Sequence, residues 1–232
     1  MTTTPIKIDI VSDVACPWCY VGKRRLEAAL AQWEETPVEI EWHPFQLDPS
    51  MPAEGKYRDE YLVSKFGDLE STKQMTSSIT EVGKDLGIDF DFGEKWLAVN
   101  TLPLHQLLEI AGQEGFKDAL KERFFKAYFV NLEPLNDMEV LFQIMGEFGW
   151  SADKVHSIIN DPAVGNVVNN KIKHFQKLGV TGVPFFVINN TYGISGAQSP
   201  ETLVNALRQV SQEQEELKTT TGDQCDIDAG DC

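Results

Sequence analysis

The sequence predicts an α/β fold in which both ends of the chain build one sheet and a large helical block is inserted between them. The segments 6–11 (IKIDIV) and 38–43 (VEIEWH) alternate apolar and polar residues as strands do, and the apolar residues of 20–34 recur at helical spacing. Strand, helix and strand in this order form a βαβ unit. From 57 to 178 the pattern is helical almost throughout.

After the helical block the chain returns to the sheet. The segment 184–189 (PFFVIN) has the composition of a strand, the residues NNTYG are typical of a turn, and 191–195 is the expected second strand of a hairpin. A last helix is expected to begin after Ser199 as its N-cap, with Pro200 at the first helical position.

These boundaries divide the sequence into three parts. Residues 1–56 and 179–210 are expected to form the domain that holds the sheet, and residues 57–178 an inserted helical domain. Residues 211–232 contain seven acidic residues and one lysine and show no apolar stripe at helical spacing. We therefore expect an acidic tail that is mobile or loosely docked.

The composition is typical of a folded protein that stays in the cytoplasm. Of the 232 residues 42% are hydrophobic, and no apolar run reaches the length of about 18 residues that a membrane-spanning helix needs. The 36 acidic and 20 basic residues give a net charge of −16, which would repel the phosphates of a nucleic acid. The first residues lack the basic and apolar regions of a signal peptide. We expect no nucleic-acid partner, no membrane contact and a cytoplasmic location.

The sequence Cys16-Pro17-Trp18-Cys19 follows the first strand and opens the first helix. A helix N-terminus favours an anion, so we expect the pKa of Cys16 to fall well below the usual value of a free thiol. Pro17 suits the first helical position, and the spacing of the cysteines brings them close enough to form a disulfide. Such a pair is typical of redox chemistry, with Cys16 as the more exposed nucleophile and Cys19 as the resolving thiol.

Two other roles for these cysteines remain open. They can be unreactive core residues, or they can supply two ligands of a structural zinc site, which needs four. The other two cysteines, Cys225 and Cys232, have six residues between them, which is too wide for a zinc knuckle. We therefore expect no metal and no cofactor.

Cys225 and Cys232 flank the acidic sequence DIDAGD in the tail. A disulfide can close this short loop, and the loop lacks the glutamate that completes a calcium site. We expect an auxiliary redox pair that exchanges with Cys16 and Cys19 or tethers the tail. Two inert thiols are the alternative.

Val183 and Pro184 stand at the start of the strand 184–189. A proline in the first position of a strand can be a plain edge feature. The alternative is a cis peptide bond, which would expose the Val183 backbone for pairing with an extended substrate.

Five segments occur along the chain in this order: SDVACPWCYVGKRRLEAAL, WHPFQLDP, NTLPLHQLLEIA, GVTGVPFFVIN and GISGAQSPETLVNAL. Together they resemble the FrnE-type branch of the DsbA-like thioredoxin-fold family, whose members are cytosolic dithiol–disulfide oxidoreductases. The resemblance covers nearly all of residues 6–209. It implies a thioredoxin fold with a large all-α insertion, and a cis Pro184 that faces the cysteine pair.

Two positions differ from what the resemblance implies. DsbA itself carries a histidine at the position of Trp18, and an indole cannot stabilise a thiolate by charge, so we expect a milder oxidant or a reductase. Many relatives are expected to carry an arginine at the position of His43. We expect His43 simply to end the strand 38–43, and a contact with the site loop is the alternative.

Three further residues have two interpretations each. Asp13 is expected to make hydrogen bonds within the turn, with proton transfer to the thiols as the alternative. Asn100 or Thr101 is expected to be a helix N-cap, and His105 a partly exposed histidine. The alternative is a functional role, because Asn100 and His105 resemble a family segment that faces the substrate cleft.

The sequence thus predicts a thiol–disulfide oxidoreductase that reduces, oxidises or isomerises protein disulfides with the CPWC dithiol. Pro17, Trp18 and Pro184 are expected to shape the site, and the Val183 backbone to bind substrate. Expected partners are protein or small-molecule thiols and disulfides, with glutathione as a candidate. Two alternatives remain. The chain also resembles glutathione-dependent kappa-class transferases and hydroxychromene carboxylate isomerases, which use a single serine at the position of Cys16. It can also be a redox-sensing binding module.

Overall fold

The computed structural model describes residues 4–222, in which both ends of the chain meet in one sheet of strand order β2-β1-β5-β6. The strands are β1 (Ile6–Ser12), β2 (Val38–Pro44), β5 (Phe185–Ile188) and β6 (Tyr192–Ser195). β1 runs parallel to β2 and antiparallel to β5, and β6 completes a hairpin with β5. The crossover from β1 to β2 is α1 (Pro17–Leu30), as the βαβ pattern predicts.

The segment between β2 and β5 is mainly helical, as its apolar spacing predicts. Its helices are α2 (Arg58–Phe66), α3 (Leu69–Asp85), α4 (Leu102–Gln113), α5 (Lys117–Phe129), α6 (Met138–Gly146), α7 (Ala152–Ile159) and α8 (Pro162–Lys177). One feature was not predicted, a two-residue ladder between β3 (Lys56–Tyr57) and β4 (Leu97–Ala98). Strands of two residues are too short to leave a periodic pattern.

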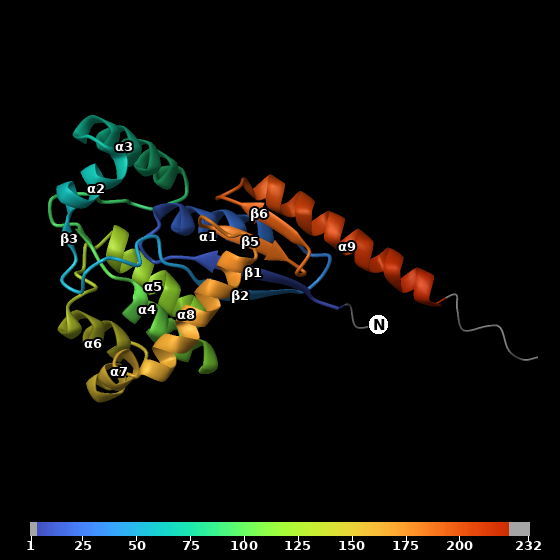
Figure 1. The fold of residues 1–232 in the computed structure, drawn as a ribbon. Coiled ribbons are helices and arrows are strands. Elements are labelled where there is room, and N and C mark those ends of the chain that lie inside the picture. Colours follow the sequence, from blue (N-terminus) through green and yellow to red (C-terminus); the bar gives the residue numbers. More distant parts are fainter. Residues whose placement is uncertain (1–3, 223–232) are drawn as a thin grey trace, which may run out of the picture.

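Helices cover both faces of the sheet (Figure 1). On one face, apolar residues of β1 and β5 such as Ile8 and Phe186 form a core with Leu26 of α1 and Leu207 of α9 (Pro200–Gly222). On the other face, Val11 packs with residues that include Phe175 of α8. α8 therefore contacts the sheet although it belongs to the segment 57–178. The division of the chain into a sheet domain and an inserted helical domain stays a prediction.

α9 extends further than the sequence predicts. It begins after Ser199, whose hydroxyl accepts a hydrogen bond from the Thr202 amide at 3.2 Å, as expected. It then continues to Gly222, so the first part of the expected loose tail is helical. Contacts to the sheet domain explain this, because the Tyr192 hydroxyl donates to Glu213 at 2.6 Å and the Ser211 hydroxyl lies 3.1 Å from that of Thr36. Among the helices of residues 4–222, none combines the length and the apolarity that crossing a membrane requires.

The N-terminal end of α1 is embedded in the core of the helical block. Cys16, Cys19 and Tyr20 belong to the same buried cluster as Phe124 and Phe125 of α5. The Tyr20 ring stacks on Phe125 with the ring centroids 5.0 Å apart. Figure 1 shows the α2–α3 pair and the α6–α7 pair on opposite sides of α4 and α5. The cysteine pair therefore lies where the turn between β1 and α1 meets the helices that stand between β2 and β5.

Candidate active site

The CPWC sequence lies at the turn between β1 and α1. Cys16 is the N-cap residue of α1 in an extended conformation, and Pro17 occupies the start of the helix, where its missing N–H costs no hydrogen bond. The Cys16 amide donates to the Asp13 carbonyl at 3.3 Å, and the Cys19 amide donates to the Cys16 carbonyl at 3.0 Å. These bonds place the second cysteine one turn behind the first.

Both cysteines are free thiols and both are buried. Cys16 is 4% exposed and Cys19 is 1% exposed, whereas the Trp18 side chain between them is 39% exposed. Cys16 is thus the more accessible thiol by a small margin. Trp18 offers an apolar surface beside it.

The backbone at Val183 contacts the Cys16 thiol directly. The peptide bond between Val183 and Pro184 is cis, as the resemblance implies. The Cys16 thiol donates to the Val183 carbonyl oxygen at 3.4 Å, which joins segments 167 positions apart. Gly22 of α1 permits this approach, because a Cβ at that position would lie 3.1 Å from Cγ of Pro184. The structure therefore brings together Cys16, Val183 and Pro184.

The electrostatics of the thiol pair differ from the expectation. The hydrogen bond with the Cys19 thiol, together with burial, raises the pKa of Cys16 well above its usual value. Burial alone would raise the pKa of Cys19 as well, but the neighbouring thiol of Cys16, the nearby Ser12 side chain and the charge of Lys121 lower it. The expectation that the helix N-terminus lowers the pKa of Cys16 is therefore wrong for the reduced pair. Once one thiol of the pair is ionised, the other retains its proton because two thiolates in one buried site would repel each other.

Asp13 and His105 form a buried pair beneath the cysteine turn. The His105 Nε2 atom lies 3.1 Å from the Asp13 Oδ1 atom, and the second Asp13 oxygen accepts the Leu47 amide at 2.8 Å. Burial would raise the pKa of Asp13, but the bonds to His105 and Leu47 keep it below the usual value. Burial lowers the pKa of His105. Asp13 does bond to its own turn, through the Ala15 amide at 3.4 Å, while the expectation of a partly exposed His105 is wrong.

Asn100 has a structural role in the contacts that the structure describes. Its side-chain oxygen accepts the Leu102 amide at 3.0 Å near the start of α4. Its side-chain nitrogen donates to the Met51 carbonyl at 2.7 Å. These bonds fix the start of α4 against the loop after β2, and His105 follows one turn later.

Lys121 of α5 is the residue of this site that sequence reasoning missed. It is 1% exposed, and its ammonium donates to the Ser12 carbonyl at 3.5 Å. The same nitrogen lies 5.1 Å from the centre of the Phe125 ring. Burial lowers the pKa of Lys121 to about 8. The sequence contains one signal, since Lys121 precedes the buried residues Phe125 and Tyr128 by four and seven positions and so shares their helix face.

His43 is the residue before the last one of β2, because the strand continues to Pro44 beyond the expected end, and it also takes part in a polar cluster. Its Nε2 atom lies 2.6 Å from Asp9, and its ring centre is 4.5 Å from that of Phe175. Asp9, Glu41 and His43 each place one ligand-type atom within 4.8 Å of the others. The Lys7 ammonium lies 3.1 Å from Asp9 and 2.9 Å from Glu41, so it supplies the positive charge at the two carboxylates.

The last pair of predicted site residues is Cys225 and Cys232. They lie outside the residues that the structure describes. Their auxiliary redox role stays a prediction.

Comparisons with known proteins extend over nearly the whole chain. A family model described as DSBA-like thioredoxin domain matches residues 7–208. A probable DsbA oxidoreductase from Streptomyces coelicolor is similar in structure, with a TM-score of 0.82, 33% sequence identity and coverage of 88% of this chain and 89% of that chain. The uncharacterized protein YwbO of Bacillus subtilis (strain 168) is 27% identical over 211 residues, which are 87% of this chain and 96% of the relative.

The isomerase alternative has a structural counterpart. The structure of a 2-hydroxychromene-2-carboxylate isomerase is similar with a TM-score of 0.68, and the match covers 91% of this chain and 98% of that chain. The identity is 12%, so this likeness shows the fold alone. The fold is the DsbA-like thioredoxin fold that the resemblance implied, and it supports a thiol–disulfide oxidoreductase in general. The chain belongs to the DSBA-like thioredoxin domain family.

Proposed function

We propose that the chain is a dithiol–disulfide oxidoreductase of the FrnE-type branch, with Cys16 as nucleophile and Cys19 as resolving thiol. The observation that carries this proposal is the contact of the Cys16 thiol with the Val183 carbonyl, at 3.4 Å, beside the cis peptide bond to Pro184. In this arrangement the Cys16 sulfur lies next to backbone with which an extended substrate can pair, and the Cys19 sulfur lies one helical turn further along α1.

The first step needs the negative charge on Cys16. The hydrogen bond between the two thiols lets the Cys16 proton move to Cys19, and the Cys19 backbone N–H lowers the pKa of Cys16. The Cys16 thiolate attacks one sulfur of a substrate disulfide. A bond forms between Cys16 Sγ and that sulfur, and the other substrate sulfur leaves as a thiolate and takes a proton.

The second step releases the substrate. Cys19 loses its proton and attacks Cys16 Sγ, so the Cys16–Cys19 disulfide forms and the bond to the substrate breaks. The substrate has then gained two electrons and the enzyme dithiol has lost two. The reverse sequence oxidises a substrate dithiol. Of the protein's atoms, the proposed reaction uses only the sulfurs of Cys16 and Cys19. We propose that it takes place in the cytoplasm.

The glutathione-dependent isomerase is the competing function. The fold likeness to the 2-hydroxychromene-2-carboxylate isomerase supports it. Cys19 argues for dithiol chemistry, because a monothiol enzyme has no use for a second thiol that hydrogen-bonds to the first. A redox-sensing module would share the thiol pair but would not catalyse repeated reduction of a disulfide substrate.

Reduction of a disulfide-linked peptide by the full chain tests the proposal. We would use a background with Cys225→Ser and Cys232→Ser, so that each mixed disulfide maps to the CPWC turn. With a chemical reductant present, the background protein should turn over without glutathione. Cys16→Ser should abolish turnover, and Cys19→Ser should accumulate a mixed disulfide at Cys16. Turnover that requires glutathione and survives Cys19→Ser would instead establish the monothiol function.

A further inference from the structure

The strand β2 forms one edge of the four-stranded sheet. Within residues 4–222, β1 is the only strand that pairs with it. The Ile6 amide donates to the Pro37 carbonyl at 2.8 Å at one end of β2, and the Phe45 amide donates to the Ser12 carbonyl at 3.2 Å at the other end. Backbone groups point to alternate sides along a strand, so the amides and carbonyls that point away from β1 are those of Val38, Ile40 and Trp42.

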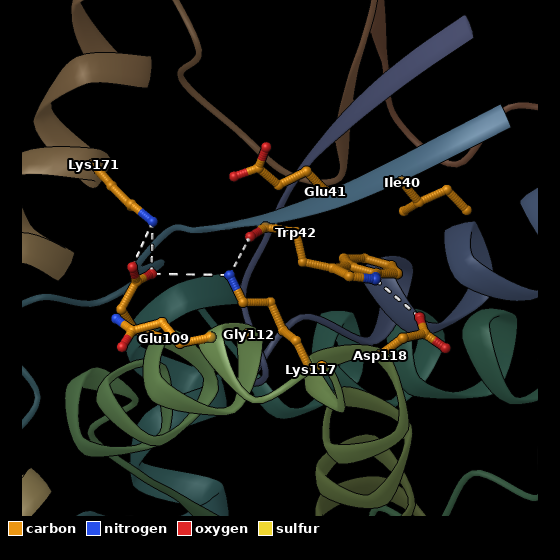
Figure 2. A pocket seen from close by; sticks show the side chains of 10 residues that line it. Ile40, Glu41, Trp42, Glu109, Gly112, Lys117, Asp118 and Lys171 are labelled. Carbon is orange, nitrogen blue, oxygen red and sulfur yellow. Dashed lines mark hydrogen bonds and ion pairs between the residues drawn. The ribbon is translucent and has the colours of Figure 1, made fainter. Parts of the chain in front are cut away.

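A lysine occupies the last of these outward groups. The Lys117 ammonium donates to the Trp42 carbonyl at 3.2 Å, and Figure 2 shows this bond beside β2. In the part of the chain that the structure describes, no hydrogen bond reaches the outward groups of Val38 and Ile40. Unpaired groups along a strand edge are a template on which another strand can add.

A groove follows the same edge. It consists of neighbouring hollows of about 400, 300 and 440 Å³. The first two share Leu30 and Val38 in their walls, and the last two share Ile40, Trp42 and Asp118. Ile40 is 41% exposed although its side chain is apolar. The edge of β2 thus combines unpaired backbone with apolar side chains, which is the arrangement that binds an added strand.

The charges at the edge indicate which segment fits. Side chains alternate along β2, so Glu39 and Glu41 share the face opposite to that of its apolar residues. The Lys7 ammonium pairs with Glu41 at 2.9 Å. Within the described residues neither Glu39, which is exposed, nor Glu34 of the groove has an ion pair. The lysines of the groove are already paired with acidic residues, and they are Lys23, Lys117 and Lys171. The charge that remains unpaired is therefore negative.

Two candidates for the added strand fit poorly. An antiparallel second copy paired about Ile40 would set Glu39 of each copy opposite Glu41 of the other, and like charges directly opposite each other are destabilising. The sequence 223–232 of the chain itself has four aspartates and no basic residue, so Glu34 and Glu39 would repel it. The groove therefore suits an extended segment of another protein that carries the opposite charge.

We propose that the outer edge of β2 binds an extended segment of a partner protein in which apolar residues alternate with lysine or arginine. The segment adds a strand to the sheet and pairs with the backbone of Val38 and Ile40 and with the Trp42 amide. Its apolar side chains lie beside Ile40 in the groove, and its basic side chains lie on the face of Glu39. Lys117 ends the pairing, because it already holds the Trp42 carbonyl.

This docking site is separate from the backbone that is proposed to bind substrate beside Cys16. β2 lies on one side of β1, whereas β5, which follows Val183, lies on the other side. The inference therefore goes beyond the proposed disulfide exchange and does not depend on it. Cys16→Ser should bind the segment as tightly as the native chain does.

Binding of a fluorescent nine-residue peptide of alternating valine and lysine to the full, reduced chain tests the proposal, with fluorescence anisotropy as the readout. A peptide with glutamate in place of lysine should bind at least about tenfold more weakly, because its charges are repelled. A third peptide keeps every lysine but carries N-methyl groups on its backbone amides. It should also bind at least about tenfold more weakly, because it cannot pair with β2.

Substitutions at the edge locate the binding. Ile40→Pro and Ile40→Ala both lose the isoleucine side chain, but only proline also loses the outward amide, and proline is tolerated on an edge strand where its nitrogen faces away from the sheet. Ile40→Pro should bind the lysine peptide at least about tenfold more weakly than Ile40→Ala. Glu39→Lys should reduce the preference for lysine over glutamate at least about threefold. Glu94→Lys, at an exposed glutamate before β4, is its control and should leave the preference unchanged.

Several outcomes would overturn the proposal. Equal binding of the three peptides, or no binding of the lysine peptide, excludes strand addition with this charge preference. An unchanged preference in Glu39→Lys places the peptide elsewhere. Weaker binding in Cys16→Ser would place it at the thiols, whereas loss of disulfide turnover in that variant concerns only the proposed function. If Ile40→Pro does not fold, the N-methylated peptide decides whether the backbone takes part.

Discussion

The Nε2 atom of His105 lies 3.1 Å from the Asp13 carboxylate, so a helix of the inserted block contacts the turn that carries the cysteines. Both side chains are buried, and Asp13 also accepts the Leu47 amide from the loop after β2. One carboxylate thus joins three segments that are distant in the sequence. The geometry of the thiol pair therefore depends on the docking of α4.

The Asp13–His105 pair is expected to make stability depend on pH. Burial lowers the pKa of His105, so the unfolded chain takes up a proton below about pH 6.5 that the folded protein resists. Stability should therefore fall as the pH drops from about 6.5, with a slope of up to about 1.4 kcal/mol per pH unit for one proton. Asp13, whose pKa stays below its usual value of 3.8, adds a loss only at lower pH, as the pH falls through its folded-state pKa.

Urea unfolding between pH 7.5 and pH 5 measures this slope. His105→Gln should reduce the slope, though not abolish it, because burial also lowers the pKa of His43. His156→Gln is the control, since His156 is exposed on α7. An unchanged slope in His105→Gln would show that the pair does not carry the pH dependence.

Trp18→His is expected to make the disulfide a stronger oxidant. Trp18 stands at the N-terminal end of α1 with its side chain 39% exposed, and an imidazolium there would stabilise the thiolate of the reduced pair. Each tenfold change in the exchange equilibrium corresponds to about 30 mV in the reduction potential. Equilibration with glutathione buffers, followed by alkylation of free thiols, gives that potential.

The charge of the new side chain can be separated from the loss of the indole. Trp18→Phe keeps an apolar ring without a charge and should leave the potential nearly unchanged. The effect of Trp18→His should be larger at pH 6 than at pH 8, because histidine loses its charge in between. An equal shift in both variants would attribute the effect to packing.

The sequence was sufficient for the local features of the fold and insufficient for the charges of the site. The start of α9 followed from its N-cap Ser199, which accepts the Thr202 amide within one turn of the chain. The burial of Lys121 depends on how α5 docks against the Ser12 carbonyl, which no local pattern reports. The raised pKa of Cys16 comes from the hydrogen bond with Cys19 and from burial, and the burial has the same origin, because the helices between β2 and β5 cover a helix N-terminus that was expected to be open.

The end of α9 limits what the tail cysteines can reach. Because α9 continues to Gly222, ten residues follow it, and they span at most about 36 Å when fully extended. Cys225 comes three residues after that helix end, so it reaches only about 10 Å from it. In place of the expected exchange with Cys16 and Cys19, this short reach favours a disulfide between Cys225 and Cys232, and we predict that deletion of residues 223–232 changes the exchange rate less than about twofold.

Peptide mapping after thiol quenching during turnover tests the tail prediction. It should find the bond between Cys225 and Cys232 and no bond from either to Cys16. A bridge from Cys16 to a tail cysteine, or a changed reduction potential after the deletion, would show that the tail takes part in the exchange.

Gly22→Ala is expected to disturb the site through the residue that packs against Pro184. A Cβ at Gly22 would lie 3.1 Å from Cγ of Pro184 and 3.3 Å from Cζ of Phe186, and both neighbours are held in or next to β5. Overpacking of this kind costs about 1–3 kcal/mol, and the higher helix propensity of alanine returns up to about 1 kcal/mol. We expect a net loss of about 1 kcal/mol in the free energy of unfolding, together with slower formation of the mixed disulfide, because the Val183 carbonyl that contacts Cys16 would shift with Pro184.

Gly146→Ala is the matched control, since a Cβ there meets no atom within 4 Å and should leave stability equal or higher. Denaturant unfolding and the single-turnover rate, measured on both variants, decide the matter. Equal effects of the two substitutions would mean that the contact between α1 and Pro184 does not position the thiol.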